Sequence, residues 1–302
     1  MKKVSIIMPN YNHAPYLKER MNSILAQDYP DYEVILLDDA STDDSAAVLS
    51  RYMTRKEVTH RVINKTNSGN TFVQWEKGLQ RAKGEYVWIA ESDDVADPGF
   101  LSRMVAVLER ENAVLAFCRS QWIDSAGQPL KRTQDTRWNR DFSMDGVAFA
   151  KRFLMGYTTI CNASAVVFRR DAAEKIPMQK VAQFTASGDR LFWIMMAMRG
   201  RVAYVADRLN KFRQHTCKVS GSAEYAGLNI VQDYEIYRMM APKLELSRYQ
   251  RRWICGYHWQ AMHRPTVSEE GRQRAMKAWG QEPLFGRWAY VVYMIHRAKE
   301  KC

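Results

Sequence analysis

The first part of the chain, from Val4 to about Arg119, alternates short apolar runs with segments whose apolar residues recur every three or four positions. The apolar runs predict buried strands, and the helical spacing predicts amphipathic helices between them. Strands that alternate with helices are typical of a mostly parallel sheet with helices on both faces. We therefore predict an α/β fold, which restricts where a ligand can bind.

The same pattern gives the approximate positions of the elements. Residue ranges with strand character are 4–8, 33–39, 62–63, 86–90 and 113–119. Ranges with helical character are 17–25, 72–79 and 99–110. An aromatic residue on a helical stripe, such as Trp75, is much more often part of the core than of a cofactor site.

Three polar loops follow predicted strands. They are PNYNH (9–13), DDASTDDS (38–45) and ESDD (91–94). In an open parallel sheet, ligands bind beyond the carboxyl ends of the strands, so the three loops are expected at one edge of the sheet. The second loop also holds Ser, Thr and Asp residues at 42–45, which are expected to cap the next helix.

Two of these loops contain several carboxylates close together in the sequence. Asp38 and Asp39 directly extend one strand, and Glu91, Asp93 and Asp94 follow another. Carboxylates at such short spacing repel one another unless hydrogen-bond donors or a cation balance them. A solvated acidic turn is the simple explanation for the second group. The alternative is a site for Mg²⁺ or Mn²⁺, since such a cation binds one or two carboxylates and completes its shell with substrate phosphate and water.

The charge of the chain indicates an anionic partner. Its 302 residues carry a formal net charge of +12, with a pI near 9.5. Such a charge suits nucleic acid, an anionic membrane surface or a phosphorylated substrate. With 46% hydrophobic residues, the chain has enough apolar material for a sizeable core, which excludes the disordered class.

The cysteines and the N-terminus bear on the compartment. Five cysteines are scattered without a C-x-x-C pair, which indicates neither a zinc site nor a disulfide framework and favours a reducing compartment. Pro9 and Asn10 break the first apolar run before a signal-peptide core is complete. No uninterrupted apolar segment approaches the ~20 residues that a transmembrane helix requires. The sequence therefore predicts a cytoplasmic protein.

Two longer segments resemble the family-2 glycosyltransferases, whose nucleotide-binding domain has the GT-A fold. They are VSIIMPNYNHAPYLKERMNSILAQDYPDYEVILLDDASTDDS (4–45) and NSGNTFVQWEKGLQRAKGEYVWIAESDD (67–94). The resemblance continues to about residue 112, then resumes more weakly at TTICNASAVVFRRD, ASGDRLFWIMMAMRG and LNKFRQHTCKVS, to about residue 220. It implies transfer of a sugar from a nucleoside-diphosphate sugar to an acceptor.

The resemblance also implies roles for residues of the three loops. Pro9 and Tyr11 would line the pocket for the nucleotide base, and Asp39 would accept hydrogen bonds from that base, usually uracil. Asp93 would bind the ribose or assist the metal, and Asp94 would bind the metal that bridges the diphosphate.

Further roles follow from the weaker part of the match. Asp189 in SGDRLFW matches the catalytic aspartate of the family, and His215 in FRQHTCKVS matches a histidine that approaches the diphosphate or metal in some relatives. Two residues depart from the family pattern. Glu91 stands where an Asp is commoner, and it is predicted to be a supporting residue of the site. Gly188 stands where an acidic residue usually precedes the catalytic aspartate. The alternative for Asp189 is a helix N-cap, and for His215 a structural hydrogen bond in a turn.

The organisation predicted from the resemblance has two parts. A GT-A domain spans 1–220, with a nucleotide-binding half at 1–115 and an acceptor-binding, catalytic half at 116–220. A basic, aromatic-rich helical extension follows at 221–302.

Two ranges of this extension, Tyr249–His263 and Leu284–Lys299, are predicted helices that mix aromatic, apolar and basic residues. Three roles stay open for them: packing on the catalytic domain, contact with an anionic membrane surface, and formation of a homodimer. Membrane contact would suit a lipid-linked acceptor and would place the protein peripherally on the inner face of the membrane.

The resemblance implies that an acceptor hydroxyl displaces a nucleoside diphosphate, usually UDP in this family, with inversion and with Mn²⁺ or Mg²⁺ as cofactor. This reaction suits the assembly of bacterial surface polysaccharide, on a saccharide or lipid-linked acceptor. A sugar nucleotidyltransferase is one alternative, although PNYNH has no glycine where such enzymes carry a phosphate loop. A basic protein that binds nucleic acid or membrane without catalysis is the other. Its acidic loops would repel phosphates, so no nucleic-acid partner is predicted.

Overall fold

The computed structural model describes residues 3–131, 138–215 and 219–299. The chain divides into two compact units. The first consists of residues 1–146, 160–185 and 195–215, and the second of residues 147–159, 186–194 and 216–302. Each unit is described by itself, and the domain boundaries drawn from the sequence stay predictions.

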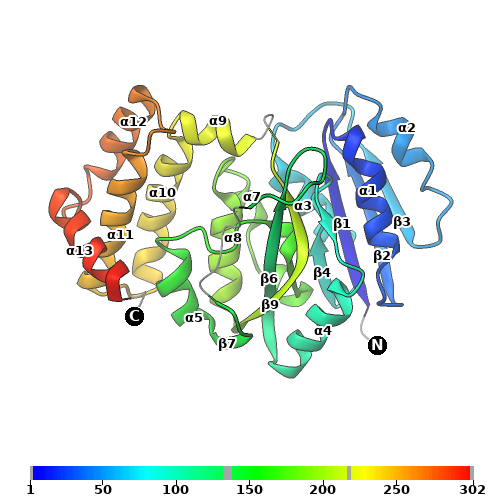
Figure 1. The fold of residues 1–302 in the computed structure, drawn as a ribbon, viewed down its shortest axis with the longest axis horizontal. Helices are drawn as coiled ribbons and strands as arrows, with labels where there is room; N and C mark the ends of the chain where they lie inside the picture. Colours follow the sequence, from blue (N-terminus) through cyan, green and yellow to red (C-terminus); the bar gives the residue numbers. More distant parts are fainter. Residues whose placement is uncertain (1–2, 132–137, 216–218, 300–302) are drawn as a thin grey trace. The chain divides into compact units, whose positions relative to one another are not determined.

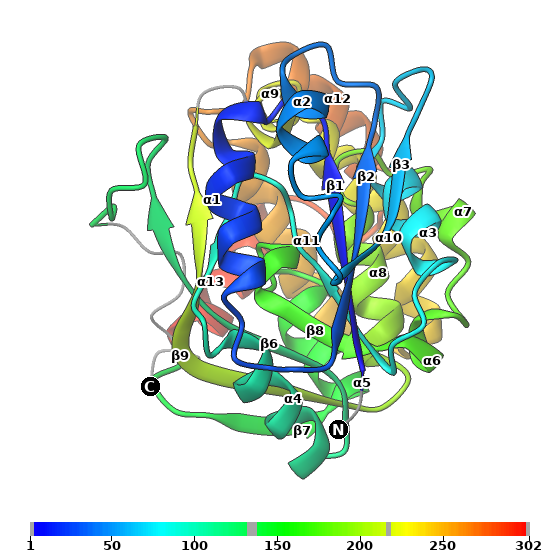
Figure 2. The same ribbon diagram turned by 90° about the vertical axis from the view of Figure 1, so that its right-hand side faces the viewer.

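The first unit contains a nine-stranded sheet with the order β3-β2-β1-β4-β8-β6-β9-β5, in which β7 also pairs with β9 (Figure 1). The strands are β1 (Val4–Asn10), β2 (Tyr32–Asp38), β3 (Val58–Ile63), β4 (Tyr86–Ile89), β5 (Val95–Ala96), β6 (Ala113–Ile123), β7 (Phe142–Asp145), β8 (Val166–Arg169) and β9 (Arg201–Arg213). Figure 2 shows β1, β2 and β3 next to one another across the sheet.

Six of the nine strands, β1, β2, β3, β4, β6 and β9, run in the same direction, which confirms the predicted fold class. β1 pairs in parallel with β2 and β4, β2 with β3, and β6 with β9. β8 lies between β4 and β6 and is antiparallel to both, so these two strands share one direction. β5 and β7 are antiparallel to β9. The predicted strands therefore form one sheet, and β8 enters it from a later part of the chain.

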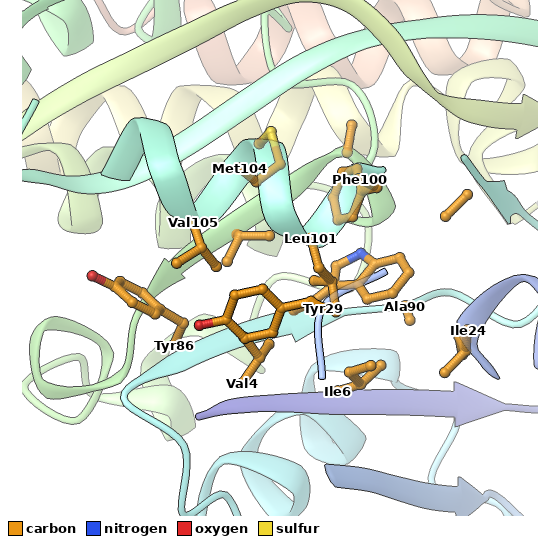
Figure 3. Close-up of a cluster of buried hydrophobic side chains, with 14 of the residues drawn as sticks. Val4, Ile6, Ile24, Tyr29, Tyr86, Ala90, Phe100, Leu101, Met104 and Val105 are labelled. Carbon is orange, nitrogen blue, oxygen red and sulfur yellow. The ribbon is translucent and has the colours of Figure 1, made fainter. Parts of the chain in front are cut away.

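Helices of the first unit cover both faces of the sheet. They are α1 (Ala14–Leu25), α2 (Ser45–Ser50), α3 (Thr71–Leu79), α4 (Phe100–Arg110), α6 (Arg170–Ala173) and α7 (Met178–Val181). One core cluster joins α1 and α4 to alternate residues of β1, among them Ile6. Figure 3 shows Phe100 and Leu101 of α4 gathered opposite Ile6. Because side chains of a strand alternate between faces, Ile7 points to the opposite side.

A glycine brings α3 close to that opposite face. A Cβ atom on Gly78 would lie 2.3 Å from Cγ2 of Ile7, a distance that no side chain tolerates. The missing side chain therefore lets α3 pack directly on β1. This packing helps to fix the loop between β3 and α3, which borders the candidate site.

The second unit is helical. Its helices are α9 (Val219–Tyr225), α10 (Leu228–Lys243), α11 (Arg248–Met262), α12 (Glu269–Trp279) and α13 (Arg287–Lys299), and α5 (Gly146–Phe149) and α8 (Gly188–Ala197) span the division between the units. A π-helical turn, Ala150–Leu154, continues α5, and a short 3₁₀ turn, Ala163–Ala165, precedes β8.

The two helices predicted in the C-terminal extension are present as α11 and α13. A capping box of Ser247 and Gln250 begins α11. Gly256 of α11 has no room for a Cβ atom, which would lie 2.1 Å from the carbonyl oxygen of Ala289, so these helices are in close contact. Among the described residues, none of the helices combines the length and the apolar character of a membrane span.

Candidate functional site

The predicted loops meet at one edge of the sheet in the first unit. β1, β2, β4 and β9 run in the same direction, so their carboxyl ends lie at the same edge. The residues that follow these strands include Asn10 to His13, Asp38 and Asp39, Glu91 to Asp94, and His215. The sheet therefore gathers polar residues from four separate parts of the sequence.

Asp38 holds the loops after β1 and β2 together. Its Oδ2 accepts a hydrogen bond from Nδ2 of Asn10 at 2.7 Å and one from the hydroxyl of Ser41 at 2.8 Å. The side chain is buried, and its Oδ1 accepts from the backbone N–H of Ser41. Hydrogen-bond donors thus balance the first carboxylate of the Asp38–Asp39 pair. In the same loop, Asp43 accepts from the N–H of Ser45, the first residue of α2, whereas the side chain of the N-cap residue, Asp44, makes no capping hydrogen bond.

Asp39 organises the loop that leads into α3. Its Oδ1 accepts hydrogen bonds from Nδ2 of Asn64 at 2.5 Å and from Nε2 of Gln74 at 2.8 Å. Its Oδ2 accepts from the hydroxyl of Ser68 at 2.6 Å. The backbone N–H of Ser68 also donates to Oδ1 at 3.0 Å and to Oδ2 at 3.1 Å. These donors occupy the roughly four lone-pair sites of a carboxylate, so a nucleotide base would replace one of them. The predicted contact between Asp39 and a base stays a prediction.

Asp94 is buried at the end of the turn after β4, with 1% of its surface exposed. Its Oδ2 accepts a hydrogen bond from Nδ2 of Asn162 at 2.8 Å, and its Oδ1 accepts from the backbone N–H of Arg213 at 2.9 Å. Burial, and then the charge of Asp93, raise the pKa of Asp94 to about 6. A metal ion would have to reach an oxygen that is already engaged, and the metal role of Asp94 stays a prediction.

Arg213 joins the acidic turn to the end of β9. Its Nε donates to the carbonyl oxygen of Asp93 at 2.7 Å, and its Nη2 lies 2.5 Å from Oε2 of Glu19 on α1. The side chain is 1% exposed, and its guanidinium lies 4.7 Å from the ring centre of Tyr16. This arginine therefore fixes the backbone on which Asp93 stands.

Asp93, His13 and His215 form a cluster of metal-ligand type. Nε2 of His215 lies 3.0 Å from Oδ2 of Asp93. One ligand atom from each of the three residues falls within 4.8 Å of the others, and all three side chains are partly buried. A set of two imidazoles and one carboxylate suits Mn²⁺ better than Mg²⁺, which prefers oxygen ligands. The residues present therefore fit a divalent transition-metal ion.

A buried arginine offsets the negative charge of the turn. Arg20 of α1 is fully buried, and its Nη2 donates to the hydroxyl of Ser164 at 3.1 Å. Burial lowers the pKa of Arg20 to about 10, while Asp94, Asp93 and Glu91 act against the shift. The guanidinium is therefore still charged at neutral pH and attracts the carboxylates of Asp93 and Asp94.

Glu91 has a different environment from the two aspartates after it. Its Oε1 accepts a hydrogen bond from Nε1 of Trp75 at 3.1 Å. Burial, and then the charge of Asp93, raise the pKa of Glu91 to about 8. The carboxyl is therefore mostly protonated at neutral pH. It acts as a neutral neighbour of the turn, consistent with the supporting position given to it from the sequence.

The two residues predicted for the base pocket, Pro9 and Tyr11, differ in their exposure to solvent. Pro9 is buried within β1, where it pairs with Leu37 of β2. Tyr11 follows the strand, and 44% of its surface is exposed. The structure thus leaves the Tyr11 ring accessible at the sheet edge, and the base-binding role of both residues stays a prediction.

Asp189 lies in the second unit, in the first turn of α8. Its Oδ1 accepts a hydrogen bond from the backbone N–H of Arg190 at 2.7 Å. Burial raises the pKa of Asp189 to about 6, against the opposing effect of Arg190. A carboxylate with this pKa can accept a proton near neutral pH, as a general base must.

Sequence reasoning did not identify three residues of the site. His13 ends the PNYNH loop, and its imidazole was the available signal, because a histidine beside a strand end is a frequent metal ligand. Arg213 stands two residues before His215 within FRQH. Arg20 gives no signal at all, since an arginine on a helix is usually exposed.

Comparisons with known proteins identify the family of this chain. The model of glycosyl transferase family 2 matches residues 5–177. The chain is 26% identical over 215 residues to an uncharacterized glycosyltransferase of Nostoc sp., covering 70% of this chain and 65% of that protein. It is 30% identical over 139 residues to poly(ribitol-phosphate) beta-N-acetylglucosaminyltransferase TarS of Staphylococcus aureus, covering 45% of this chain and 24% of TarS. The chain therefore spans less than two thirds of the length of either relative.

Solved structures show the same fold. Residues 1–349 of S. aureus TarS in complex with UDP-GlcNAc superpose with a TM-score of 0.71 at 19% identity, covering 97% of this chain and 84% of that one. Mannosyltransferase PcManGT of Pyrobaculum calidifontis, in complex with GDP-Man and Mn²⁺, gives 0.58 at 18% identity, covering 97% and 83%. The family model covers more than half of the sequence, and the sheet is that of the GT-A fold. The chain belongs to glycosyl transferase family 2.

Proposed function

We propose that the protein transfers a sugar, with inversion, from a UDP-linked donor to an acceptor hydroxyl in a reaction that depends on a divalent metal ion. The observation that carries this proposal is the cluster of His13, Asp93 and His215 at the edge of a GT-A sheet. It supplies a cation site beside the loops where the nucleotide is expected.

The charges of the first unit suit a diphosphate leaving group. A bound divalent cation would offset the negative charge that develops on the diphosphate as the glycosidic bond breaks. His13, Asp93 and His215 would hold that cation, and the hydrogen bond from Arg213 to the carbonyl oxygen of Asp93 keeps the turn in place. Asp39 would accept a hydrogen bond from the base once a donor such as Ser68 moves away.

Asp189 is the proposed general base. An acceptor hydroxyl is a weak nucleophile at neutral pH, so a carboxylate must take its proton as the oxygen attacks the anomeric carbon. A single displacement needs one such base and inverts the anomeric centre. The first-turn position of Asp189 and its raised pKa of about 6 support this role, because the carboxylate is ionised above that pH.

The donor can be tested with purified protein. TarS is described in complex with UDP-GlcNAc and PcManGT in complex with GDP-Man and Mn²⁺, so both nucleotides belong in the panel. We expect a UDP-sugar with Mn²⁺ to raise the melting temperature and to be hydrolysed slowly to UDP. A response to GDP-sugars alone would overturn the proposed base, and no response to any sugar nucleotide would overturn the function.

Family membership favours sugar transfer over the two alternatives from the sequence. Synthesis of an activated sugar would produce pyrophosphate from a nucleoside triphosphate, which a coupled assay detects directly. Nucleic-acid binding would appear as retention on heparin or DNA that survives high salt. We expect neither result.

We further propose a saccharide or lipid-linked acceptor in the assembly of bacterial surface polysaccharide, with the protein on the cytoplasmic side and in peripheral contact with an anionic membrane. Helix α13 supports membrane contact, because it exposes large apolar side chains while Tyr293 and His296 pack inward. The exposed apolar residues are Trp288, Val291, Met294 and Ile295. The helix also carries Arg287, Arg297 and Lys299, and no Asp or Glu occurs among its described residues.

Vesicle flotation tests this contact. Because apolar burial and attraction to anionic lipid act together, binding to vesicles that contain phosphatidylglycerol should exceed binding to neutral vesicles and weaken with salt. The double change Trp288→Gln and Ile295→Gln should lower it by at least about tenfold. Met276→Gln, at an exposed position of α12, is the matched control. A protein that stays with neither vesicle, or that forms a dimer through α13, would overturn membrane contact.

A further inference from the structure

The residue that follows the proposed base in the sequence belongs to a buried ion pair. Arg190 follows Asp189 in α8, and its Nη1 lies 3.2 Å from Oδ2 of Asp233 on α10. The side chains are only 10% and 7% exposed. The second arm of the guanidinium, Nη2, donates to Oγ1 of Thr158 at 2.7 Å. Burying an ion pair carries a large desolvation cost, so a specific role for this pair is worth testing.

The same helix α10 also holds the backbone that enters α8. Oε1 of Gln232 accepts hydrogen bonds from the N–H of Ala186 at 2.8 Å and from the N–H of Ser187 at 3.1 Å. The hydroxyl of Ser187 donates to the carbonyl oxygen of Asn229. Two consecutive residues of α10 therefore fix the start of α8. Gln232 binds the backbone that precedes the helix, and Asp233 binds the side chain of Arg190 in its first turn.

A neutral histidine lies near the same oxygen of Asp233 as Arg190 does. His258 of α11 is fully buried, and its Nδ1 lies 3.9 Å from Oδ2 of Asp233. Its ring stacks on Trp279, with ring centres 4.3 Å apart and planes 18° from parallel. Burial, then the charges of Arg190 and Arg264, lower the pKa of His258 well below its usual value. The imidazole is therefore neutral, so the positive charges that act on Asp233 are those of Arg190 and Arg264.

The two members of the pair act on Asp189 in opposite directions. The positive charge of Arg190 favours the ionised carboxylate, and the negative charge of Asp233 disfavours it. Burial raises the pKa of Asp233 itself, and the charges of Arg190 and Arg264 oppose that shift. With both charges present, their effects on the carboxylate partly cancel.

We propose that the Arg190–Asp233 pair is a positioning element that fixes the first turn of α8 and balances the charge around Asp189. The inference rests on the proposed role of Asp189 as the base. In this inference, Arg190 and Asp233 tune the pKa of Asp189. Neither residue contacts the donor or the acceptor.

Opposite shifts in the pH profile test this inference. The acid limb of the profile is the fall of kcat at low pH, which the pKa of Asp189 would set. Asp233→Asn removes a negative neighbour of Asp189, so the acid limb should move to lower pH by about 1 unit. Arg190→Gln removes a positive neighbour, so the limb should move up by a similar amount. The double variant should return the limb close to that of the unaltered protein. Asp207→Asn, which breaks the exposed pair of Asp207 with Arg103, is the matched control and should not move it.

A structural role without tuning gives different results. It would lower kcat in both variants with the acid limb unmoved, or move both limbs in the same direction, and either outcome overturns the inference. Circular dichroism melting of each variant establishes that it folds. If Arg190→Gln does not fold, Asp233→Asn and the double variant still test the inference. The acid limb of kcat should then lie at a lower pH in Asp233→Asn than in the double variant.

A second readout keeps the inference separate from the proposed function. The carboxyl carbon of Asp189 can be followed by ¹³C NMR in protein labelled at Asp, with Asp189→Asn used to assign its signal. Its titration midpoint should move down in Asp233→Asn and up in Arg190→Gln even if no sugar is transferred. Unmoved midpoints would overturn the inference, whereas shifted midpoints with no transfer would overturn only the proposed function.

Discussion

Nε2 of His215 lies 3.0 Å from Oδ2 of Asp93, which joins the residues after β9 to the turn after β4. The two positions are far apart in the sequence, and the parallel strands bring them to one edge of the sheet. The ring of His13 completes the group, with its centre 5.6 Å from that of His215. Three ligand atoms at this spacing are suited to a single cation.

Replacing His215 should weaken metal binding. We expect His215→Ala to lower the affinity for Mn²⁺ by at least about tenfold, since one of three ligands is lost. Calorimetric titration of Mn²⁺ in the presence of UDP measures the change. His263→Ala, which removes an exposed histidine just after α11, should leave the affinity unchanged. Equal Mn²⁺ affinities in the two variants would contradict the assignment.

The neighbouring carboxylates should separate into a ligand and a structural group. Asp93→Asn is expected to lose Mn²⁺ binding with little effect on melting, because Asp93 is partly exposed. Asp94→Ala leaves the buried donors of Asn162 and Arg213 without acceptors, so it should cost about 1–3 kcal/mol of stability. Thermal melting combined with Mn²⁺ titration distinguishes the two. Loss of Mn²⁺ binding in Asp94→Ala at unchanged melting temperature would instead make Asp94 the ligand.

The sequence predicts five strands of the first unit, β1, β2, β3, β4 and β6, because each depends on a local pattern. It did not predict β5, β7, β8 or β9. Asp39 and Asp93 could be expected at one edge once a parallel sheet was predicted, since strand ends converge. His215 follows β9, which was not among the predicted strands, so only the family resemblance gave it a role near the diphosphate or metal. The insertion of β8 between β4 and β6 has no local signal, because strand order depends on contacts between distant segments. Arg20 could not be predicted as buried, since its burial depends on carboxylates that approach it only in the folded sheet.

Asp39 offers a test of base recognition. If its carboxylate accepts a hydrogen bond from uracil, Asp39→Ala should lower the affinity for UDP by at least about tenfold, as expected for a lost bond to a charged group. Ser68→Ala removes the hydroxyl that donates to Oδ2 at 2.6 Å and should keep or raise the affinity, because an acceptor becomes free. Fluorescence or calorimetric titration with UDP measures both. Equal losses in the two variants would indicate a structural role for Asp39.

Gly78 offers a test of the packing beneath the site. In Gly78→Ala the new methyl group would meet Cγ2 of Ile7 at 2.3 Å, so α3 must shift from β1, at a cost of about 1–3 kcal/mol. Gly221→Ala is the matched control, because no atom lies within 4 Å of its added Cβ and alanine favours the helix by about 1 kcal/mol. Urea denaturation followed by circular dichroism compares them. A stabilised Gly78→Ala would contradict the close packing of α3.

The pH dependence of transfer should follow Asp189. Its carboxylate must be ionised to accept the proton of the acceptor, and its pKa is raised to about 6, mainly by burial. Transfer should therefore fall about tenfold per pH unit below 6 and level off above it, whereas a base with the ordinary pKa of Asp would keep full activity down to about pH 4.

Asp189→Asn supplies the control for this profile. It should reduce kcat by about 10²- to 10⁴-fold while UDP binding stays the same, because only the proton acceptor is lost. The profile is measured as the initial rate of UDP release at saturating donor and acceptor. An Asp189→Asn variant that retains substantial transfer, with the acid limb still near pH 6, would assign that limb to another group and remove Asp189 from the role of base.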